Sequence, residues 1–147
     1  MNTPQDSPLC LFTRGSRGFG IPIGAVGGVI EPESLVPMPF SPPRLVGLCP
    51  HRRQVLPVFR LDEAAPTPAG SVVILIRSDQ GLWGIQADRD GIAVVINPSR
   101  GEGSTRAPGG IATARHDGRT FDVIDPEACW TALRGEVQDH YHDRAPT

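Results

Sequence analysis

The side chains with the most obvious chemical potential stand near the end of the sequence, where His140, His142 and Asp143 occur together in the stretch HYHD. Imidazole and carboxylate groups are ordinary zinc ligands, so in principle these three residues could hold a metal. A catalytic metal also requires ligands that neighbouring side chains hold in place. Because the surrounding stretch EVQDHYHDRAPT is polar, we interpret residues 136–147 as a flexible, solvated tail and predict no metal site.

Candidates for acid–base or nucleophilic catalysis lack partners in the sequence. His51 and His116 have neither an acid nor a nucleophile at a recognisable spacing, and no GxSxG motif is present. The carboxylate pairs at 62–63 and 88–90 fall where strands are expected to end, and Asp commonly bonds to the backbone in turns. We therefore predict that the protein is not an enzyme and binds no cofactor.

A glycine-rich stretch, GFGIPIGAVGG at residues 18–28, resembles a phosphate-binding loop only superficially. Its glycines do not follow the GxGxxG spacing, and Pro22 with the β-branched residues around it disfavours the helix whose N-terminus would bind a phosphate. A P-loop also requires a lysine, and all fourteen Lys and Arg residues of this chain are arginines. The stretch is therefore predicted to form strands.

Charge and cysteine content limit the class of protein further. The formal net charge is −2, which is not the excess of positive charge that binding to nucleic acid or anionic membranes usually requires. Cys10, Cys49 and Cys129 are odd in number and lie far apart, so neither a disulfide framework nor a zinc knuckle is indicated. No stretch has the pattern of a signal peptide or of a membrane-spanning helix. We expect a cytoplasmic protein.

Short apolar runs separated by glycine and proline indicate an all-β fold. The chain has 17 glycines and 16 prolines, and they fall between the runs instead of gathering in one linker. Many short strands at such spacing are typical of small closed or packed barrels. We predict ten strands, at residues 9–13, 18–23, 25–30, 44–48, 54–61, 71–77, 81–88, 91–96, 109–115 and 119–124.

One helix is expected after the last strand, in DPEACWTALRG. Asp125 suits the N-cap and Pro126 the first helical position, and Gly135 is expected to end the helix. The face that carries Cys129, Ala132 and Leu133 is predicted to pack on a barrel, with Trp130 partly buried. We also expect residues 1–8 to be a flexible tail, residues 9–135 to form the folded domain, and residues 62–70 to be a hinge between two halves.

Four stretches follow one another in a characteristic order, and one of them is LVGLCPHRRQVLPVFRL at residues 45–61. In their order and spacing they resemble the CheW-like domain family of bacterial chemotaxis adaptors. LVGLCPHRRQVLPVFRL is similar to the family's motif G-v-x-N-L-R-G-x-v-l-P-v-x-D-L without a gap, and Arg52 occupies the motif arginine. The similarity continues in LFTRGSRGFGIPIGAVGGVI before this motif, and in SVVILIRSDQGLWGIQADRDGIAVVI and GIATARHDGRTFDVIDPEACWTAL after it. The resemblance covers about 125 residues, from Leu9 to Leu133.

This resemblance implies a fold, a function and partners. The fold would be all-β, with two small five-stranded SH3-like barrels that share a core and a short C-terminal helix. The function would be a non-enzymatic scaffold that couples chemoreceptor cytoplasmic helices to a CheA-like histidine kinase regulatory domain. The partner-binding residues would be Val26, Val29, Arg52, Val55 and Pro57, with Arg52 in a groove between the barrels. Alternatively, Arg52 braces its own loop, and the two valines at 26 and 29 only pack in the core.

Three positions depart from the family pattern. Arg53 replaces a glycine, Arg60 replaces an aspartate, and Gly28 stands where an acidic residue is common. Because arginine rarely adopts positive φ, we expect the loop at 50–54 to follow a path of its own. Two alternatives for the function remain open: a CheW-like module in a signalling complex without chemoreceptors, and a nucleic-acid-binding barrel that uses Arg52, Arg53 and Trp83 as a charged and stacking surface.

Overall fold

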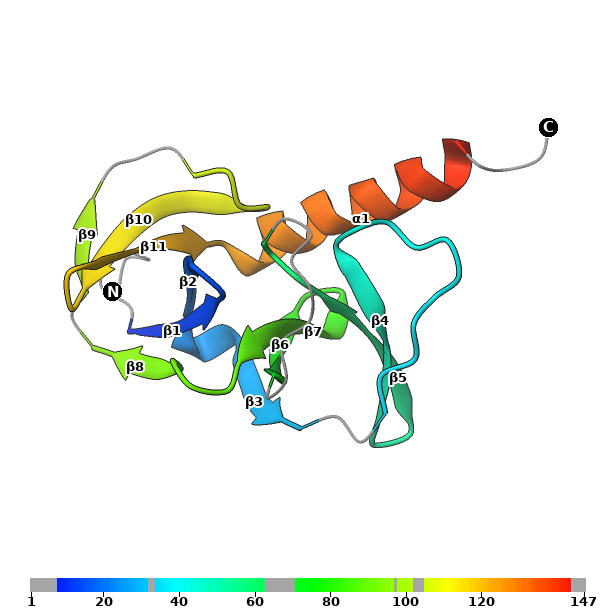
Figure 1. The fold of residues 1–147 in the computed structure, drawn as a ribbon, viewed down its shortest axis with the longest axis horizontal. Coiled ribbons are helices and arrows are strands. Elements are labelled where there is room, and N and C mark those ends of the chain that lie inside the picture. Colours follow the sequence, from blue (N-terminus) through cyan, green and yellow to red (C-terminus); the bar gives the residue numbers. More distant parts are fainter. Residues whose placement is uncertain (1–7, 32–33, 63–70, 97, 102–104, 144–147) are drawn as a thin grey trace.

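The computed structural model describes residues 8–31, 34–62, 71–96, 98–101 and 105–143, and these contain a mainly β fold with one α-helix (Figure 1). The ten predicted strands are all present. Their bounds are β1 Leu9–Arg14, β2 Arg17–Pro22, β3 Val26–Ile30, β4 Leu45–His51, β5 Gln54–Phe59, β6 Ser71–Ser78, β7 Gly81–Asp88, β8 Ala93–Val95, β10 Gly110–His116 and β11 Arg119–Ile124. An additional short strand, β9 Ser99–Gly101, pairs with β10.

The strands form two sheets, which confirms the predicted architecture of two barrel-like units. One sheet has six strands in the order β8-β1-β2-β11-β10-β9, and the other has five in the order β3-β6-β7-β5-β4. The first has one strand more than expected because β9 joins its edge. Figure 1 shows the two sheets side by side, with the helix α1 (Pro126–Asp143) passing along both.

The two sheets follow the same plan. In the first, the hairpins β1–β2 and β10–β11 are joined by a parallel pairing of their second strands, at Asp122 and Phe19. In the other, the hairpins β6–β7 and β4–β5 are joined in the same way, at Val58 and Gly84. The remaining strand pairings are antiparallel among the described residues. Each unit is therefore built from two hairpins.

The expected hinge at 62–70 does not separate the two sheets. Residues 63–70 lie outside the described part of the chain, and the strands on either side of them, β5 and β6, belong to the same sheet. The chain passes between sheets instead through a 3-10 turn at Ile23–Ala25 and through the short connection from β7 to β8. The predicted tail at 1–8 is also largely outside the described residues, which begin at Pro8.

Buried side chains of the described residues form three clusters. Each sheet encloses a small one, and a large one lies between the sheets and α1. Strand β6 shows how this arrangement follows from the sequence: Val73 and Leu75 face the inside of the five-stranded sheet, whereas Ile74 and Ile76 face the shared core. A strand that is buried on both faces is apolar at successive positions, as SVVILIR is.

The helix begins as predicted but ends later. Asp125 caps it, since its Oδ2 accepts a hydrogen bond from the amide of Ala128 at 2.9 Å. Cys129 and Leu133 are fully buried, but Ala132 is exposed. The prediction of a stop at Gly135 and a flexible tail from 136 is wrong, because α1 continues through Asp143. Residues 144–147 lie outside the described part of the chain.

Candidate partner-binding surface

The β4–β5 hairpin carries the motif arginine at its tip. His51 and Gln54 form the last pair of the two strands, so Arg52 and Arg53 are the two central residues of the turn. Their φ angles are 46° and 68°, respectively, and a two-residue turn of the I′ type requires positive φ at both positions. The premise that arginine would avoid this conformation is therefore wrong. Non-glycine residues in this region cost about 1–3 kcal/mol each.

A groove of about 420 Å³ lies beside this turn. We call it the hairpin groove, and its lining residues are Gly27, Gly28, Val29, Ile30, His51, Arg52, Gln54, Leu75, Arg77 and Leu82. All of them belong to the five-stranded sheet or to the turn within it. The expectation that Arg52 lies in a groove between the two barrels is therefore wrong. Arg53 is not part of the lining, so the two arginines of the turn are not equivalent.

The hairpin groove presents cationic side chains without a carboxylate among its lining residues. Arg77 is held in position by a hydrogen bond from its Nη2 to the carbonyl of Val26, at 3.1 Å. Glu31, just beyond β3, is paired with Arg89. Gly28 explains the missing acid of the family pattern: it sits at a bulge in the β3–β6 pairing with a φ of 143°, which L-residues rarely adopt.

The predicted partner-binding residues do not form one site. Val29, with 46% of its surface exposed, and Arg52 line the hairpin groove together. Val55 is 63% exposed on β5, one residue beyond Gln54. Val26 instead packs partly against the shared core, as the alternative of simple core packing anticipated. Pro57 lines a different depression, on the outer side of the hairpin.

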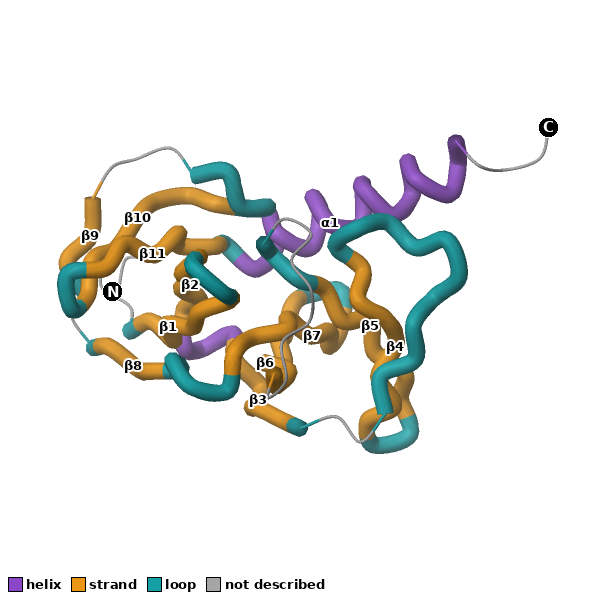
Figure 2. The backbone as a smooth tube through the Cα atoms, in the orientation of Figure 1, coloured by secondary structure: helices purple, strands orange, loops and turns teal. Residues whose placement is uncertain are grey.

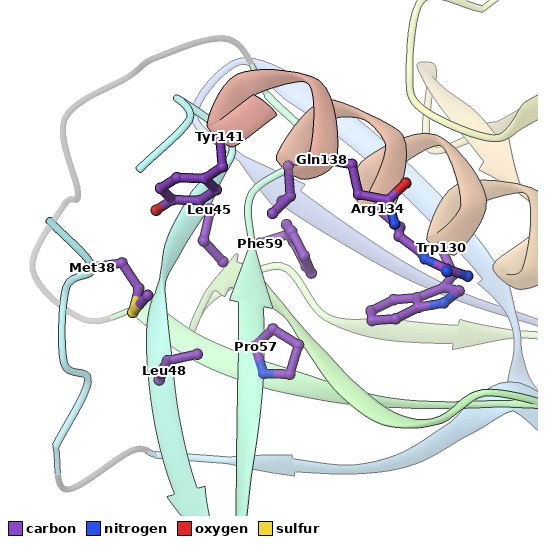
Figure 3. A pocket seen from close by; sticks show the side chains of 10 residues that line it. Met38, Leu45, Leu48, Pro57, Phe59, Trp130, Arg134, Gln138 and Tyr141 are labelled. Carbon is purple, nitrogen blue, oxygen red and sulfur yellow. The ribbon is translucent and has the colours of Figure 1, made fainter. Parts of the chain in front are cut away.

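This second depression is an apolar cleft of about 270 Å³ between the hairpin and α1 (Figure 3). We call it the helix cleft, and its lining residues are Met38, Leu45, Leu48, Pro57, Phe59, Trp130, Arg134, Val137, Gln138 and Tyr141. Figure 3 shows Tyr141 and Gln138 on the last turns of α1, above the strands that carry Leu45 and Phe59. This cleft was not predicted from the sequence, because the helix was expected to end at Gly135, before several of the residues that form one wall of the cleft.

The connection between β3 and β4 holds the last turns of α1. Tyr141 donates a hydrogen bond to the carbonyl of Pro39 at 3.4 Å, and the ring of His140 bonds to the carbonyl of Phe40. An ion pair of 3.1 Å joins Arg44 to Glu136. The same connection runs outside β4 (Figure 2). These contacts explain why residues that look solvated in the sequence are ordered into helix.

Gly47 allows the connection to approach the hairpin closely. The backbone of Val36 bonds in both directions to Leu48, with N–O distances of 2.8 Å. A Cβ atom at Gly47 would lie 2.5 Å from the carbonyl oxygen of Val36, which is closer than such atoms come in proteins. The motif glycine therefore has a packing role, because only a residue without a side chain lets the two segments pair at this point.

A buried group of charges connects the two sheets, and it was not predicted from the sequence. Arg14, at the end of β1, is only 2% exposed, and its guanidinium lies 3.5 Å from a carboxylate oxygen of Asp62 and 3.5 Å from one of Asp88. The other oxygen of Asp88 accepts a hydrogen bond from the amide of Gly15 at 2.9 Å. Both aspartates come from the five-stranded sheet side, so the ion pairs span the junction. Sequence reasoning assigned these aspartates to ordinary turns.

The other residues considered for chemistry occupy structural positions. Trp83 is 1% exposed in the shared core, which rules out its use as a stacking platform for bases. His140 and His142 lie two residues apart on α1, a spacing that points side chains in different directions. Within the described ranges, no group of three or more His, Cys, Asp or Glu residues could hold a metal ion.

The three cysteines are buried and free. Burial, and to a lesser extent the nearby carboxylates of Asp125 and Glu136, raise the pKa of the Cys129 thiol to about 12. A thiol with such a pKa is not a nucleophile near neutral pH. Among the described residues, no helix is both long enough and apolar enough to cross a membrane.

Comparisons with known proteins agree with one another. The model of the CheW-like domain family matches residues 8–133, which include all strands of both sheets and the first half of α1. Among solved structures, the scaffolding protein TtCheW from Thermoanaerobacter tengcongensis is similar, with a TM-score of 0.66 and 16% sequence identity over 82% of this chain and 89% of that one. This likeness supports the fold. No curated protein matched the sequence.

Proposed function

The chain belongs to the CheW-like domain family, and from this premise we propose that it is a non-enzymatic adaptor in the cytoplasm. In this role it couples a chemoreceptor-type input to a histidine kinase of the CheA type. The observation that carries the proposal is the family match over residues 8–133. It agrees with a surface that offers a groove and a cleft in which segments of a protein partner could lie.

The hairpin groove is the surface we assign to partner recognition. Arg52 and Val29 line it, and Val55 extends the exposed surface along β5. Exposed apolar side chains beside a guanidinium combine burial of area with directed hydrogen bonds, which is a common composition for the centre of a protein interface. Pro57 lines the helix cleft, on the other side of the same hairpin, and would make a second contact there. Val26 would act indirectly, by packing β3 on the core.

A binding experiment tests the proposal through the two arginines of the turn. Arg52 lines the hairpin groove and Arg53 does not. We therefore expect Arg52→Glu to weaken binding to the kinase regulatory domain or to the receptor fragment at least tenfold, which corresponds to about 1.4 kcal/mol. Arg53→Glu should have a much smaller effect, because exposed ion pairs at a rim contribute only about 0–1 kcal/mol. Isothermal titration calorimetry with purified fragments from the same organism measures both.

The control for these variants is Arg115→Glu, which changes an exposed arginine of the six-stranded sheet. Circular dichroism shows whether each variant is folded. Equal losses for Arg52→Glu and Arg53→Glu would indicate a general electrostatic patch, and unfolding by Arg52→Glu would show that Arg52 braces its own turn. If the unaltered protein binds neither fragment, the adaptor role itself is wrong.

A further inference from the structure

We propose that the hairpin groove binds an extended, acidic segment of a protein partner, in which carboxylate and apolar side chains alternate. The segment would pair with the free edge of β3 and direct its carboxylates to Arg52 and Arg77. This inference rests on the proposed adaptor function and specifies the chemistry of the partner at that surface. It follows from three observations: the charge of the lining residues, the position of β3 as the terminal strand of its sheet, and the apolar floor of the groove.

The charge of the groove selects an anionic partner. Arg52 and Arg77 contribute two guanidinium groups, His51 contributes an imidazole, and none of the ten lining residues is acidic. Arg77 donates one hydrogen bond, from Nη2, to the carbonyl of Val26, and this bond holds the side chain in place. The guanidinium has other N–H groups that can bind a partner. Hydrogen bonds between guanidinium and carboxylate are among the strongest in proteins, and like charges are strongly disfavoured.

The backbone of β3 offers the means of pairing. β3 is the first strand in the order β3-β6-β7-β5-β4, so one of its edges pairs with no other strand among the described residues. Gly27 and Gly28 lie on this strand and line the groove, and they leave its wall without side chains for two successive residues. An incoming backbone can approach such a wall closely. Strand addition at an exposed edge is a general mode of peptide recognition.

The floor of the groove requires apolar side chains between the carboxylates. Leu75 and Leu82 line it, and both also belong to or pack on the inner cluster of the five-stranded sheet. Val29 adds an exposed apolar surface at the rim. Successive side chains of a strand point to opposite sides, so a segment in which Glu and Val alternate can place one type toward the leucines and the other toward the rim.

Nucleic acid fits the same groove poorly. Binding of single strands combines several phosphate contacts with aromatic side chains on which bases stack. The groove has two arginines, and none of its ten lining residues is Phe, Tyr or Trp. Trp83, the aromatic residue of β7, is buried in the shared core. The net charge of the chain is −2, which opposes long contacts with a polyanion.

The test uses synthetic peptides as probes for the intact protein. A short capped peptide with alternating Glu and Val is titrated beside its Gln–Val and Lys–Val counterparts, and amide chemical shifts are followed by NMR. We expect the Glu–Val peptide to shift the amides of residues 27–30 and 51–54. The Gln–Val peptide should bind roughly tenfold more weakly or worse, and the Lys–Val peptide should not bind.

Protein variants identify the groups responsible. Arg52→Gln and Arg77→Gln should each weaken binding of the Glu–Val peptide roughly three- to fivefold, as expected for partly solvated ion pairs. The matched control Arg115→Gln, on the six-stranded sheet, should leave it unchanged. Equal affinity for the Glu–Val and Gln–Val peptides, shifts that map outside the groove, or tighter binding of a single-stranded oligonucleotide would overturn the inference.

The same protein samples separate this inference from the adaptor function. If no peptide binds but the kinase or receptor fragment does, the inference is wrong and the function stands. If the fragments fail to bind and the Glu–Val peptide binds as described, the groove has the proposed chemistry and the assigned partners are wrong. Thermal melting of each variant confirms that a lost signal does not come from unfolding.

Discussion

The two sheets of this protein share a plan but differ at equivalent turns. Each contains a hairpin whose second strand makes the parallel contact, β10–β11 in one sheet and β4–β5 in the other. Both hairpins have two central turn residues with positive φ. In β10–β11 these residues are Asp117 and Gly118, with φ angles of 51° and 74°. In β4–β5 they are Arg52 and Arg53, which adopt nearly the same angles.

Asp-Gly is one of the preferred sequences for such a turn, and Arg-Arg is not. A sequence without backbone strain can therefore form a turn of this type, and the turn of the β10–β11 hairpin has such a sequence. The strained sequence lies in the hairpin that borders the hairpin groove. Strain of this kind is typically retained where a side chain serves function rather than stability. The comparison thus supports a binding role for the five-stranded end, and changes at several places can test it.

The largest expected effect concerns the core on which both sheets depend. Trp83 lies in contact range of the rings of Phe59 and Trp130, with centroid distances of 6.0 and 5.6 Å. Trp83→Ala removes a fully buried ring from the cluster that both sheets and α1 share, so we expect a loss of about 3–5 kcal/mol in the free energy of unfolding. Urea denaturation measures the loss, and hydrogen exchange shows where protection falls.

If the sheets form one cooperative unit, Trp83→Ala lowers the protection of β1 and β2 as much as that of β6 and β7. Loss confined to the five-stranded sheet would mean that the two units are independently stable. Trp83→Phe is the matched variant and should cost less, because it keeps an aromatic ring. It also removes an indole N–H that has no hydrogen-bond partner among the described residues.

The buried charges between the sheets give the next largest effect. Arg14→Met leaves the carboxylate of Asp62, which is 3% exposed, without its cation. Breaking a buried ion pair in this way typically costs 3–5 kcal/mol, and we expect about 3 because Asp88 keeps its bond to the amide of Gly15.

The double variant Arg14→Met/Asp62→Leu should be more stable than Arg14→Met alone, since an apolar pair can replace a buried ion pair at little cost. Chemical denaturation of four proteins, the unaltered chain, Arg14→Met, Asp62→Leu and the double variant, gives the coupling energy. Additive losses would show that the 3.5 Å contact between Arg14 and Asp62 carries no energy. The ion pair between Arg14 and Asp62 would then not stabilise the packing of the two sheets against each other.

The helix makes a further difference between the two sheets, because its last two turns lie over the β4–β5 hairpin. Truncation after Gly135 removes Val137, which packs on the shared core, and the partner of Arg44. We expect a loss of about 2 kcal/mol, because truncation removes partly buried apolar side chains and a partly exposed ion pair. Thermal melting tests this. Truncation after Asp143 is the control, and an equal stability of both truncated forms would restore the interpretation of a solvated tail.

The strands were predictable because their apolar runs are long enough to reveal burial on one or both faces. β9 was not, since Ser99–Gly101 contains no apolar residue and the strand forms only by pairing with the edge of β10. The end of α1 was missed for a related reason: Gly135 is a valid stop signal locally. The contacts of Tyr141 and His140 that override it come from a connection about a hundred residues earlier.

The candidate site was predictable only in part. The predicted strands at 44–48 and 54–61 placed Arg52 correctly in the loop between them. Which valines lie beside Arg52 depends on the sheet to which β3 belongs, and the sequence does not show that. Val29 lies beside Arg52 in the hairpin groove, whereas Val26 packs partly against the shared core. The ion pairs of Arg14 with Asp62 and Asp88 were not predicted, because the three residues come from the ends of three strands that lie far apart in the sequence.

The smallest expected effect addresses the two turns directly. Arg53 has a φ of 68°, is exposed and does not line the hairpin groove. Arg53→Gly removes the conformational strain of a side chain at positive φ, but glycine also gains more freedom in the unfolded chain. The net result should be a stabilisation of roughly 0.5–1 kcal/mol, measured as a higher denaturant midpoint at constant m. Arg53→Ala is the control: it removes the charge and keeps the Cβ atom, so it should bring little or no gain.

The reverse change, Gly118→Arg in the other sheet, should destabilise the protein by a similar or larger amount, because the φ of Gly118 is 74°. Equal gains from Arg53→Gly and Arg53→Ala would mean that charge repulsion between the neighbouring arginines, and not backbone conformation, makes this turn costly. In that case the difference between the two turns would be electrostatic.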